Sequence, residues 1–114
     1  MRQAPAIDGA LIGGFLIDGN DHRGGVLILD DAIQPWSGEL GPTLLDLVAG
    51  AGREKVELVL LGLGRSWSPP PRPFREALSG MNIGLEVMTT PEAIRLYNML
   101  ASDGRRLAAA LAPL

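Results

Sequence analysis

Residues 83–105, IGLEVMTTPEAIRLYNMLASDGR, contain the signals for a strand, a helix and the turns that bound them. The apolar residues 83–87 predict a short strand. Thr90 is predicted to be the N-cap of the helix, because its hydroxyl can accept a hydrogen bond from a free amide, and Pro91 follows where a missing N–H costs nothing. Gly104 can adopt the left-handed conformation that ends a helix. Between these residues the apolar side chains recur with the helical period, at Ala93, Leu96, Tyr97, Leu100 and Ala101.

Upstream of this unit the chain alternates between helical and strand patterns. A helical rhythm follows Pro42 and stops at Gly50 or Gly52. The nearly continuous apolar run at 56–61 is typical of a strand that is covered on both faces. A short helix is predicted over 74–80, before the strand at 83–87. This order of strand, helix, strand and helix favours parallel neighbouring strands joined by crossovers.

Residues 106–111, RLAAAL, allow two interpretations. The three alanines have high helix propensity, whereas Gly104 has just ended a helix and Pro113 stops the pattern. We expect a strand that returns to the sheet. The predicted fold class is therefore α/β, as one domain over residues 1–114 in which 1–6 form a loose lead-in.

The N-terminal third predicts antiparallel strands. Residues 10–17 read as one strand interrupted at Gly13–Gly14, where paired glycines indicate a bulge or a close approach of another backbone. The turn signal at 18–21 predicts a hairpin into a strand at 25–29. Residues 33–36 predict a further short strand, and Pro35 favours an edge position for it.

Composition excludes several classes of function. The 114 residues carry 10 Lys and Arg against 13 Asp and Glu, and the scattered cations do not form the basic patch that nucleic-acid binding requires. There is no Cys, which excludes disulfides and thiol chemistry, and the single His22 argues against a zinc site. No apolar run reaches the roughly 20 residues of a transmembrane helix. Because the first residues lack a signal core and a basic presequence, we expect a cytoplasmic protein.

The strongest candidate site lies where two predicted parallel strands end. Ligands of open α/β sheets collect outside the carboxyl ends of the strands, and a helix N-terminus there favours an anion. Free backbone amides, threonine and serine hydroxyls and one arginine would meet in this crevice. The following helix would add the side-chain amide of an asparagine. The candidate residues are Gly62, Gly64, Arg65, Ser66, Thr89, Thr90 and Asn98. The alternative is structural: the glycines let the chain turn, Thr90 caps its helix and Asn98 lies on the helix surface.

The recognised catalytic motifs are missing. The GLG at 62–64 lacks the third glycine of a dinucleotide fingerprint, and neither a phosphate loop nor a GxSxG elbow is present. Asp30 and Asp31 are interpreted as turn residues. Trp36 and Trp67 lie in loop-like contexts, where they are candidate anchors of a partner surface or half-buried plugs of the fold.

Four parts of the chain form a recognisable set: GGFLIDGNDHRGGVLIL at 13–29, Trp36, LVLLGLG at 58–64 and EVMTTPEAIRLYNMLASDGRRLAAALAP at 86–113. Together they resemble the family called domain of unknown function 498. The most specific part is the closing pattern Met88-x-Thr90, Ala93, Arg95, Tyr97-Asn98, Leu100, Gly104-Arg105. The chain departs from the family pattern at three positions. The family usually has a threonine at the positions of Leu63 and Leu96, and often a small residue or cysteine at the position of Ile94. These departures weaken any claim that the crevice performs chemistry.

The resemblance implies a compact α/β domain with a central mixed, mostly parallel sheet flanked by helices and an extra β-layer from the N-terminal hairpins. It also implies that no enzymatic activity or cofactor is firmly established for the family, and the composition argues against a metal site. Mitochondrial members of the family bind partner proteins during assembly of respiratory complex I, and this chain looks like one of its bacterial relatives. Our first hypothesis is therefore a non-catalytic protein-interaction or assembly factor, with respiratory-complex subunits among its expected partners. The second is a small-molecule or anion-binding protein or enzyme that uses the crevice. Homo-oligomerisation through an exposed sheet edge is compatible with both.

Overall fold

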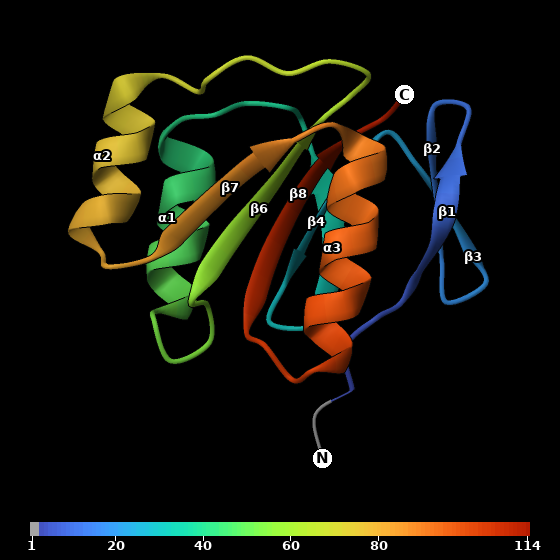
Figure 1. Ribbon diagram of the computed structural model, residues 1–114, viewed down its shortest axis with the longest axis horizontal. Coiled ribbons are helices and arrows are strands. Elements are labelled where there is room, and N and C mark those ends of the chain that lie inside the picture. The colour runs from blue at the N-terminus through green and yellow to red at the C-terminus, as the bar shows by residue number, and fades with distance from the viewer. Residues whose placement is uncertain (1–2) are drawn as a thin grey trace.

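The computed structural model describes residues 3–114, and over this range the chain folds into two sheets and three helices (Figure 1). The smaller sheet contains three strands in the order β1-β2-β3, and the larger contains five in the order β5-β4-β8-β6-β7. The elements, in chain order, are β1 (Ile7–Leu11), β2 (Gly14–Ile17), β3 (Asn20–Arg23), β4 (Gly25–Leu29), β5 (Ala32–Trp36), α1 (Pro42–Ala51), β6 (Leu58–Leu63), α2 (Arg72–Gly80), β7 (Gly84–Met88), α3 (Thr90–Ser102) and β8 (Leu107–Ala112).

The larger sheet is mixed, with two parallel and two antiparallel strand pairings, which confirms the predicted α/β fold class. β6 lies between β7 and β8 and pairs with both in parallel. β4 runs antiparallel to β8 and to β5. Four of the five strands in this sheet, β5, β8, β6 and β7, therefore point the same way, and β4 alone opposes them.

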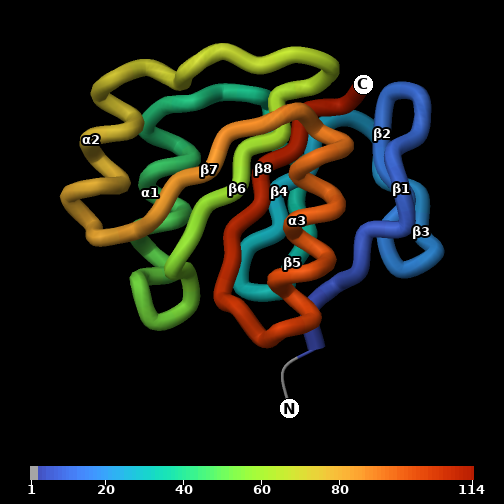
Figure 2. Tube along the Cα trace, in the orientation of Figure 1, coloured from blue at the N-terminus to red at the C-terminus, as the bar shows by residue number. Residues whose placement is uncertain are grey.

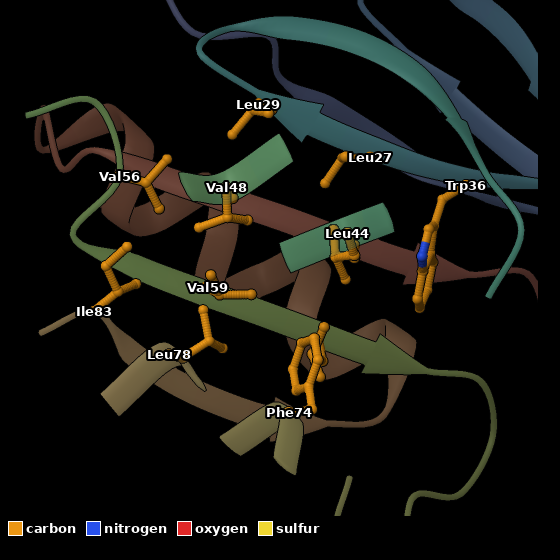
Figure 3. Close-up of a cluster of buried hydrophobic side chains, with 13 residues drawn as sticks. Leu27, Leu29, Trp36, Leu44, Val48, Val56, Val59, Phe74, Leu78 and Ile83 are labelled. Carbon is orange, nitrogen blue, oxygen red and sulfur yellow. The ribbon is translucent and has the colours of Figure 1, made fainter. Parts of the chain in front are cut away.

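The molecule is built in layers on the two faces of the larger sheet. The side chains of α1 and α2 pack on one face, against alternate residues such as Val59 and Leu61 (Figure 3). α3 and the smaller sheet cover the other face, where Leu60 and Ala109 point. This alternation follows from the two-residue period of a strand. Figure 2 shows the C-terminal end of the chain beside the β1–β2 hairpin, at the end of the molecule where α3 begins.

β8 is a strand despite its three alanines, as expected. Its residues pair with β4 on one side and with β6 on the other, so Ala108 to Ala110 lie fully buried in the middle of the sheet. Tertiary pairing on both edges overrides helix propensity, which is worth only a fraction of 1 kcal/mol per residue. The small side chains leave room for α3 on one face and for α1 on the other.

Two predictions about the N-terminal third are wrong. Residues 10–17 do not form one bulged strand, because Gly13 adopts φ +74° and the chain turns there between β1 and β2. The turn at Asp18 and Gly19, both with positive φ, joins β2 to β3 and not to residues 25–29. β4 instead enters the larger sheet. The predicted edge strand containing Pro35 is confirmed as β5.

The N-cap prediction is also wrong, by one residue. Thr89 has the extended φ and ψ of an N-cap, and Thr90 is already the first helical residue. The Thr89 amide donates to Glu92 Oε1 at 3.2 Å, which completes a capping box with this glutamate. Thr90 is thereby turned inward, toward the ends of β6 and β8.

Candidate functional site

The side chain of Thr90 joins the ends of three elements. It is fully buried, at 0% exposure. Its hydroxyl accepts a hydrogen bond from the Gly64 amide at 2.8 Å and donates one to the Ala112 carbonyl at 2.7 Å. The Thr90 amide donates to the Gly64 carbonyl at 2.8 Å. The structure thus brings the ends of β6 and β8 and the start of α3 together, and it uses these polar atoms within the chain.

Gly62 lies directly beneath the first turn of α3. A Cβ placed at Gly62 would stand 2.9 Å from the Ala93 Cβ, 2.9 Å from Leu111 Cδ2 and 3.0 Å from the Thr90 Cα. These separations are shorter than van der Waals contact. The glycine therefore sets the close approach of α3 to the sheet.

Thr89 and Glu92 form a polar pair at the helix start. The Thr89 hydroxyl donates to Glu92 Oε1 at 2.6 Å. This hydrogen bond is the largest cause of a lowered pKa of the Glu92 carboxyl, and the hydrogen bond from the Thr89 amide is the second. A negative charge in the first turn also interacts favourably with the helix dipole. An anion that approached this helix end would meet a carboxylate that is already there.

The loop that follows β6 carries the exposed members of the candidate set, Arg65 and Ser66. Arg65 lines a hollow of about 170 Å³ with Leu114 and with the β1–β2 hairpin residues Ala10, Leu11 and Ile12. The Ile12 side chain is 94% exposed. Trp67, two residues after Arg65 on the same loop, is 49% exposed.

Asn98 lies apart from this group and contacts β1. Its Oδ1 accepts a hydrogen bond from the Ile7 amide at 2.9 Å, and its Nδ2 donates one to the Ile7 carbonyl at 2.8 Å. The neighbouring Tyr97 is buried and its hydroxyl donates to the Pro5 carbonyl at 2.9 Å. Both side chains tie the N-terminal segment to α3. Residues 1–2 of the predicted lead-in lie outside the described residues.

The two tryptophans have different surroundings. Trp36 is 8% exposed and belongs to the core cluster under α1, and its Nε1 donates to the Glu39 carbonyl at 3.1 Å (Figure 3). Of the two residues predicted as candidate partner anchors, the structure therefore exposes Trp67 and buries Trp36.

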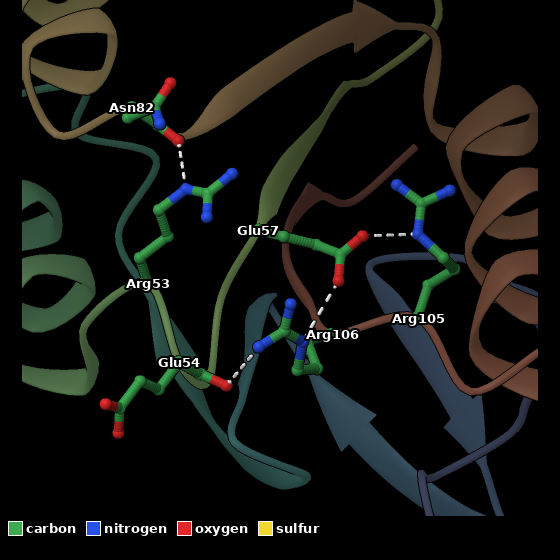
Figure 4. A network of polar contacts seen from close by, with 6 residues as sticks. All are labelled: Arg53, Glu54, Glu57, Asn82, Arg105 and Arg106. Carbon is green, nitrogen blue, oxygen red and sulfur yellow. Dashed lines mark hydrogen bonds and ion pairs between the residues drawn. The ribbon is translucent and has the colours of Figure 1, made fainter.

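A charged cluster at the opposite end of the sheet was not predicted. Glu57 pairs through Oε1 with Arg105 and through Oε2, at 3.0 Å, with Arg106 (Figure 4). Arg106 also donates to the Glu54 carbonyl at 2.8 Å. The hydrogen bond from Arg105 is the largest cause of a lowered pKa of the Glu57 carboxyl. This cluster joins the start of β8 to the start of β6.

Residues 3–114 contain no group of three His, Cys, Asp or Glu side chains placed to hold a metal ion. Within the same residues, no helix combines the length and the apolar character needed to cross a bilayer.

Comparison with known proteins identifies the family. A family model described as "Protein of unknown function (DUF498/DUF598)" matches residues 7–112. An uncharacterised protein of Rhodobacter capsulatus is 40% identical over 108 residues, which cover 95% of this chain and 84% of that protein. The zebrafish and human proteins named NADH dehydrogenase [ubiquinone] 1 alpha subcomplex assembly factor 3 are 32% and 29% identical and are aligned with 88% and 97% of this chain. The chain spans only 59% and 62% of their lengths.

Solved structures share the fold. The solution structure of a Rhodopseudomonas palustris protein is 33% identical, with a TM-score of 0.77 over 100% of this chain and 89% of that one. The crystal structure of a Bartonella henselae protein described as an outer membrane protein is 25% identical, with a TM-score of 0.83 over 96% and 95% of the two chains. Together with the family model, these similarities show that this chain belongs to the DUF498/DUF598 family of proteins of unknown function.

Proposed function

We propose that this protein acts by binding other proteins, as a non-catalytic factor in the assembly of a respiratory or other membrane-associated complex. Its similarity to two vertebrate complex I assembly factors supports this function, and so does the alignment of nearly all of this chain with them. Assembly requires a surface that a partner can recognise.

The observation that carries the proposal is the exposure of apolar side chains at the end of the molecule where α3 begins. Ile12 and Arg65, more than fifty residues apart in the chain, line one hollow, and Trp67 is exposed two residues further along the loop that carries Arg65. Isolated exposed aliphatic residues are common, whereas tryptophan and arginine are the residue types enriched in interaction hot spots. The polar atoms of Gly64 and Thr90 below this surface are used in internal hydrogen bonds. We assign Ile12, Arg65 and Trp67 to the partner-binding surface.

The test is affinity capture from a native extract with solubilised membranes, followed by identification of the co-eluting proteins. The wild-type chain is expected to recover stoichiometric subunits of a respiratory complex. A variant with Trp67→Ala and Ile12→Ser should recover roughly tenfold less, since loss of a hot spot costs about 1–2 kcal/mol or more.

Met99→Ala provides the matched control. Met99 is an apolar side chain of similar exposure, at 56%, but it lies on α3 away from the loop. The control should recover as much partner as the wild type. Recovery of the chain alone, or equal recovery by the double variant, would contradict the proposal.

A further inference from the structure

Among residues 3–114, no strand pairs with the outer side of β7. Within this range β7 pairs with β6 alone, and the Gly84 amide donates to the Glu57 carbonyl on that side at 3.0 Å. Because backbone groups alternate in direction along a strand, the N–H and C=O groups of Leu85 and Val87 point away from β6. At the other edge of the sheet, β5 carries Pro35, which has no N–H to donate. β7 is therefore the edge of this sheet that can accept a further strand.

A groove lies beside the start of this edge, at residues 82–85. It is a hollow of about 390 Å³ whose one wall is α2, through Arg75, Leu78 and Ser79, and whose other wall is residues 82–85. The α2 residues recur at the three- and four-residue spacing that defines one face of a helix. Leu78 is buried, so the inner part of the groove is apolar. A groove between a helix and an edge strand is the geometry in which domains of several kinds bind an extended peptide by strand addition.

One arginine lines the groove and a second lies beside it. Arg75 is exposed and its Nε donates to the Pro70 carbonyl at 3.2 Å, which fixes the base of the guanidinium at the groove. Near the start of β7, Arg53 Nε donates to the Asn82 carbonyl at 2.7 Å (Figure 4). No Asp or Glu lies among the described residues that line the hollow. Glu86 is in register with Leu60, so its side chain points to the α3 face and not to the α2 face.

We propose that an extended, acidic segment of a partner protein binds along β7 as an additional strand, in the groove between β7 and α2. This inference rests on the proposed function, because the occupant is another protein, and it adds a second contact surface with a defined chemistry. Main-chain hydrogen bonds to Leu85 and Val87 supply affinity, and carboxylates facing Arg75 and Arg53 supply selectivity. A second copy of this chain is a poorer occupant, since a two-fold pairing of β7 strands brings the same arginines of both copies to one interface.

The test uses two synthetic peptides of about seven residues, one alternating valine with glutamate and the other alternating valine with lysine. Binding to the full chain is measured by fluorescence anisotropy and by amide chemical shifts. The glutamate peptide is expected to shift the amides of residues 75–88 and to bind at least about tenfold more tightly than the lysine peptide. Val87→Pro should abolish binding, because it removes an outward N–H and spares the ladder to β6, whereas Val87→Ala should bind normally. Arg75→Glu should invert the preference between the peptides, whereas Arg95→Glu, on α3, should not.

Three results would overturn this inference. They are equal affinity for the two peptides, shifts confined to another surface, and a concentration-dependent dimer that Val87→Pro dissociates. If Val87→Pro misfolds, Arg75→Glu still decides the question. The two proposals can fail separately. If capture of complex subunits is lost with the Trp67 and Ile12 changes but is unaffected by Arg75→Glu, the proposed function stands and the groove is not a binding site.

Discussion

Asn98 of α3 holds Ile7 of β1 through both polar atoms of its side-chain amide. Oδ1 accepts from the Ile7 amide at 2.9 Å and Nδ2 donates to the Ile7 carbonyl at 2.8 Å. A neighbouring strand would offer β1 the same pair of groups, so one side chain of a helix stands in for a strand at the edge of the smaller sheet. This contact, across 91 residues of sequence, attaches the smaller sheet to the rest of the fold.

Asn98→Asp is expected to lower the free energy of unfolding by about 1–3 kcal/mol, because a carboxylate cannot donate to the Ile7 carbonyl and would repel it. Urea unfolding monitored by tryptophan fluorescence measures the change. Ser102→Ala is the control on the same helix, since the Ser102 hydroxyl donates its hydrogen bond within the helix, to the Met99 carbonyl at 3.0 Å. That variant should change stability by less than about 0.5 kcal/mol. Equal effects of the two substitutions would show that Asn98 does not fix β1.

The C-terminal half of the fold could be predicted because its signals are local. Apolar runs mark β6 and β7, Pro91 marks the start of α3 and Gly104 its end, and short crossovers favour parallel strands. The N-terminal third could not be predicted in the same way. A pair of glycines fits a bulge or a turn equally well, and the partner of β2 is decided by packing on residues such as Tyr97, far away in the sequence.

The candidate site shows the same division between local and distant signals. The sequence places Gly62, Gly64 and Thr90 at strand and helix ends, and the structure brings them together. Which partner each polar atom takes depends on the register of β8, which sets the Ala112 carbonyl against the Thr90 hydroxyl. That register follows from pairing on both edges of β8 and has no local sequence signal.

Thr90→Val is expected to destabilise the protein by about 1–3 kcal/mol. The substitution keeps the shape of the side chain but leaves the buried Gly64 amide and Ala112 carbonyl without their hydroxyl partner. Thr90→Ser retains the hydroxyl and should lose less than half as much. Chemical denaturation compares the three chains. If Thr90→Val costs no more than Thr90→Ser, the hydrogen bonds of the hydroxyl contribute no more than the contacts of the methyl group, which contradicts the prediction.

Gly62→Ala and Gly50→Ala are expected to have effects of opposite sign. The new methyl at residue 62 would meet Ala93, Leu111 and Thr90 at 3.0 Å or less and should cost about 1–3 kcal/mol of stability. At residue 50, inside α1, an added Cβ would meet no heavy atom within 4 Å outside its own turn of helix, so alanine should stabilise the protein by about 0.4–1 kcal/mol. Thermal unfolding of both variants tests the pair. A neutral Gly62→Ala would mean that α3 can move away from the sheet without penalty.

The Glu57 cluster should make stability depend on pH. The hydrogen bond from Arg105, and then the one from Arg106, lower the pKa of the Glu57 carboxyl in the folded protein, although partial burial opposes them. A carboxyl with a lowered pKa binds fewer protons in the folded than in the unfolded chain. Its contribution to stability is therefore complete above the ordinary glutamate pKa of about 4.3 and is lost as the pH falls through the lowered value.

Glu57→Gln removes this contribution, so the variant should lose less stability than the wild type between about pH 6 and about pH 3. Urea unfolding at a series of pH values measures both curves. Glu54→Gln is the matched control, because Glu54 contacts Arg106 through its backbone carbonyl, which the substitution leaves in place. The control should follow the wild-type curve. Parallel curves for the wild type and Glu57→Gln would show that the pKa of this carboxyl is the same in the folded and the unfolded chain, which contradicts the prediction.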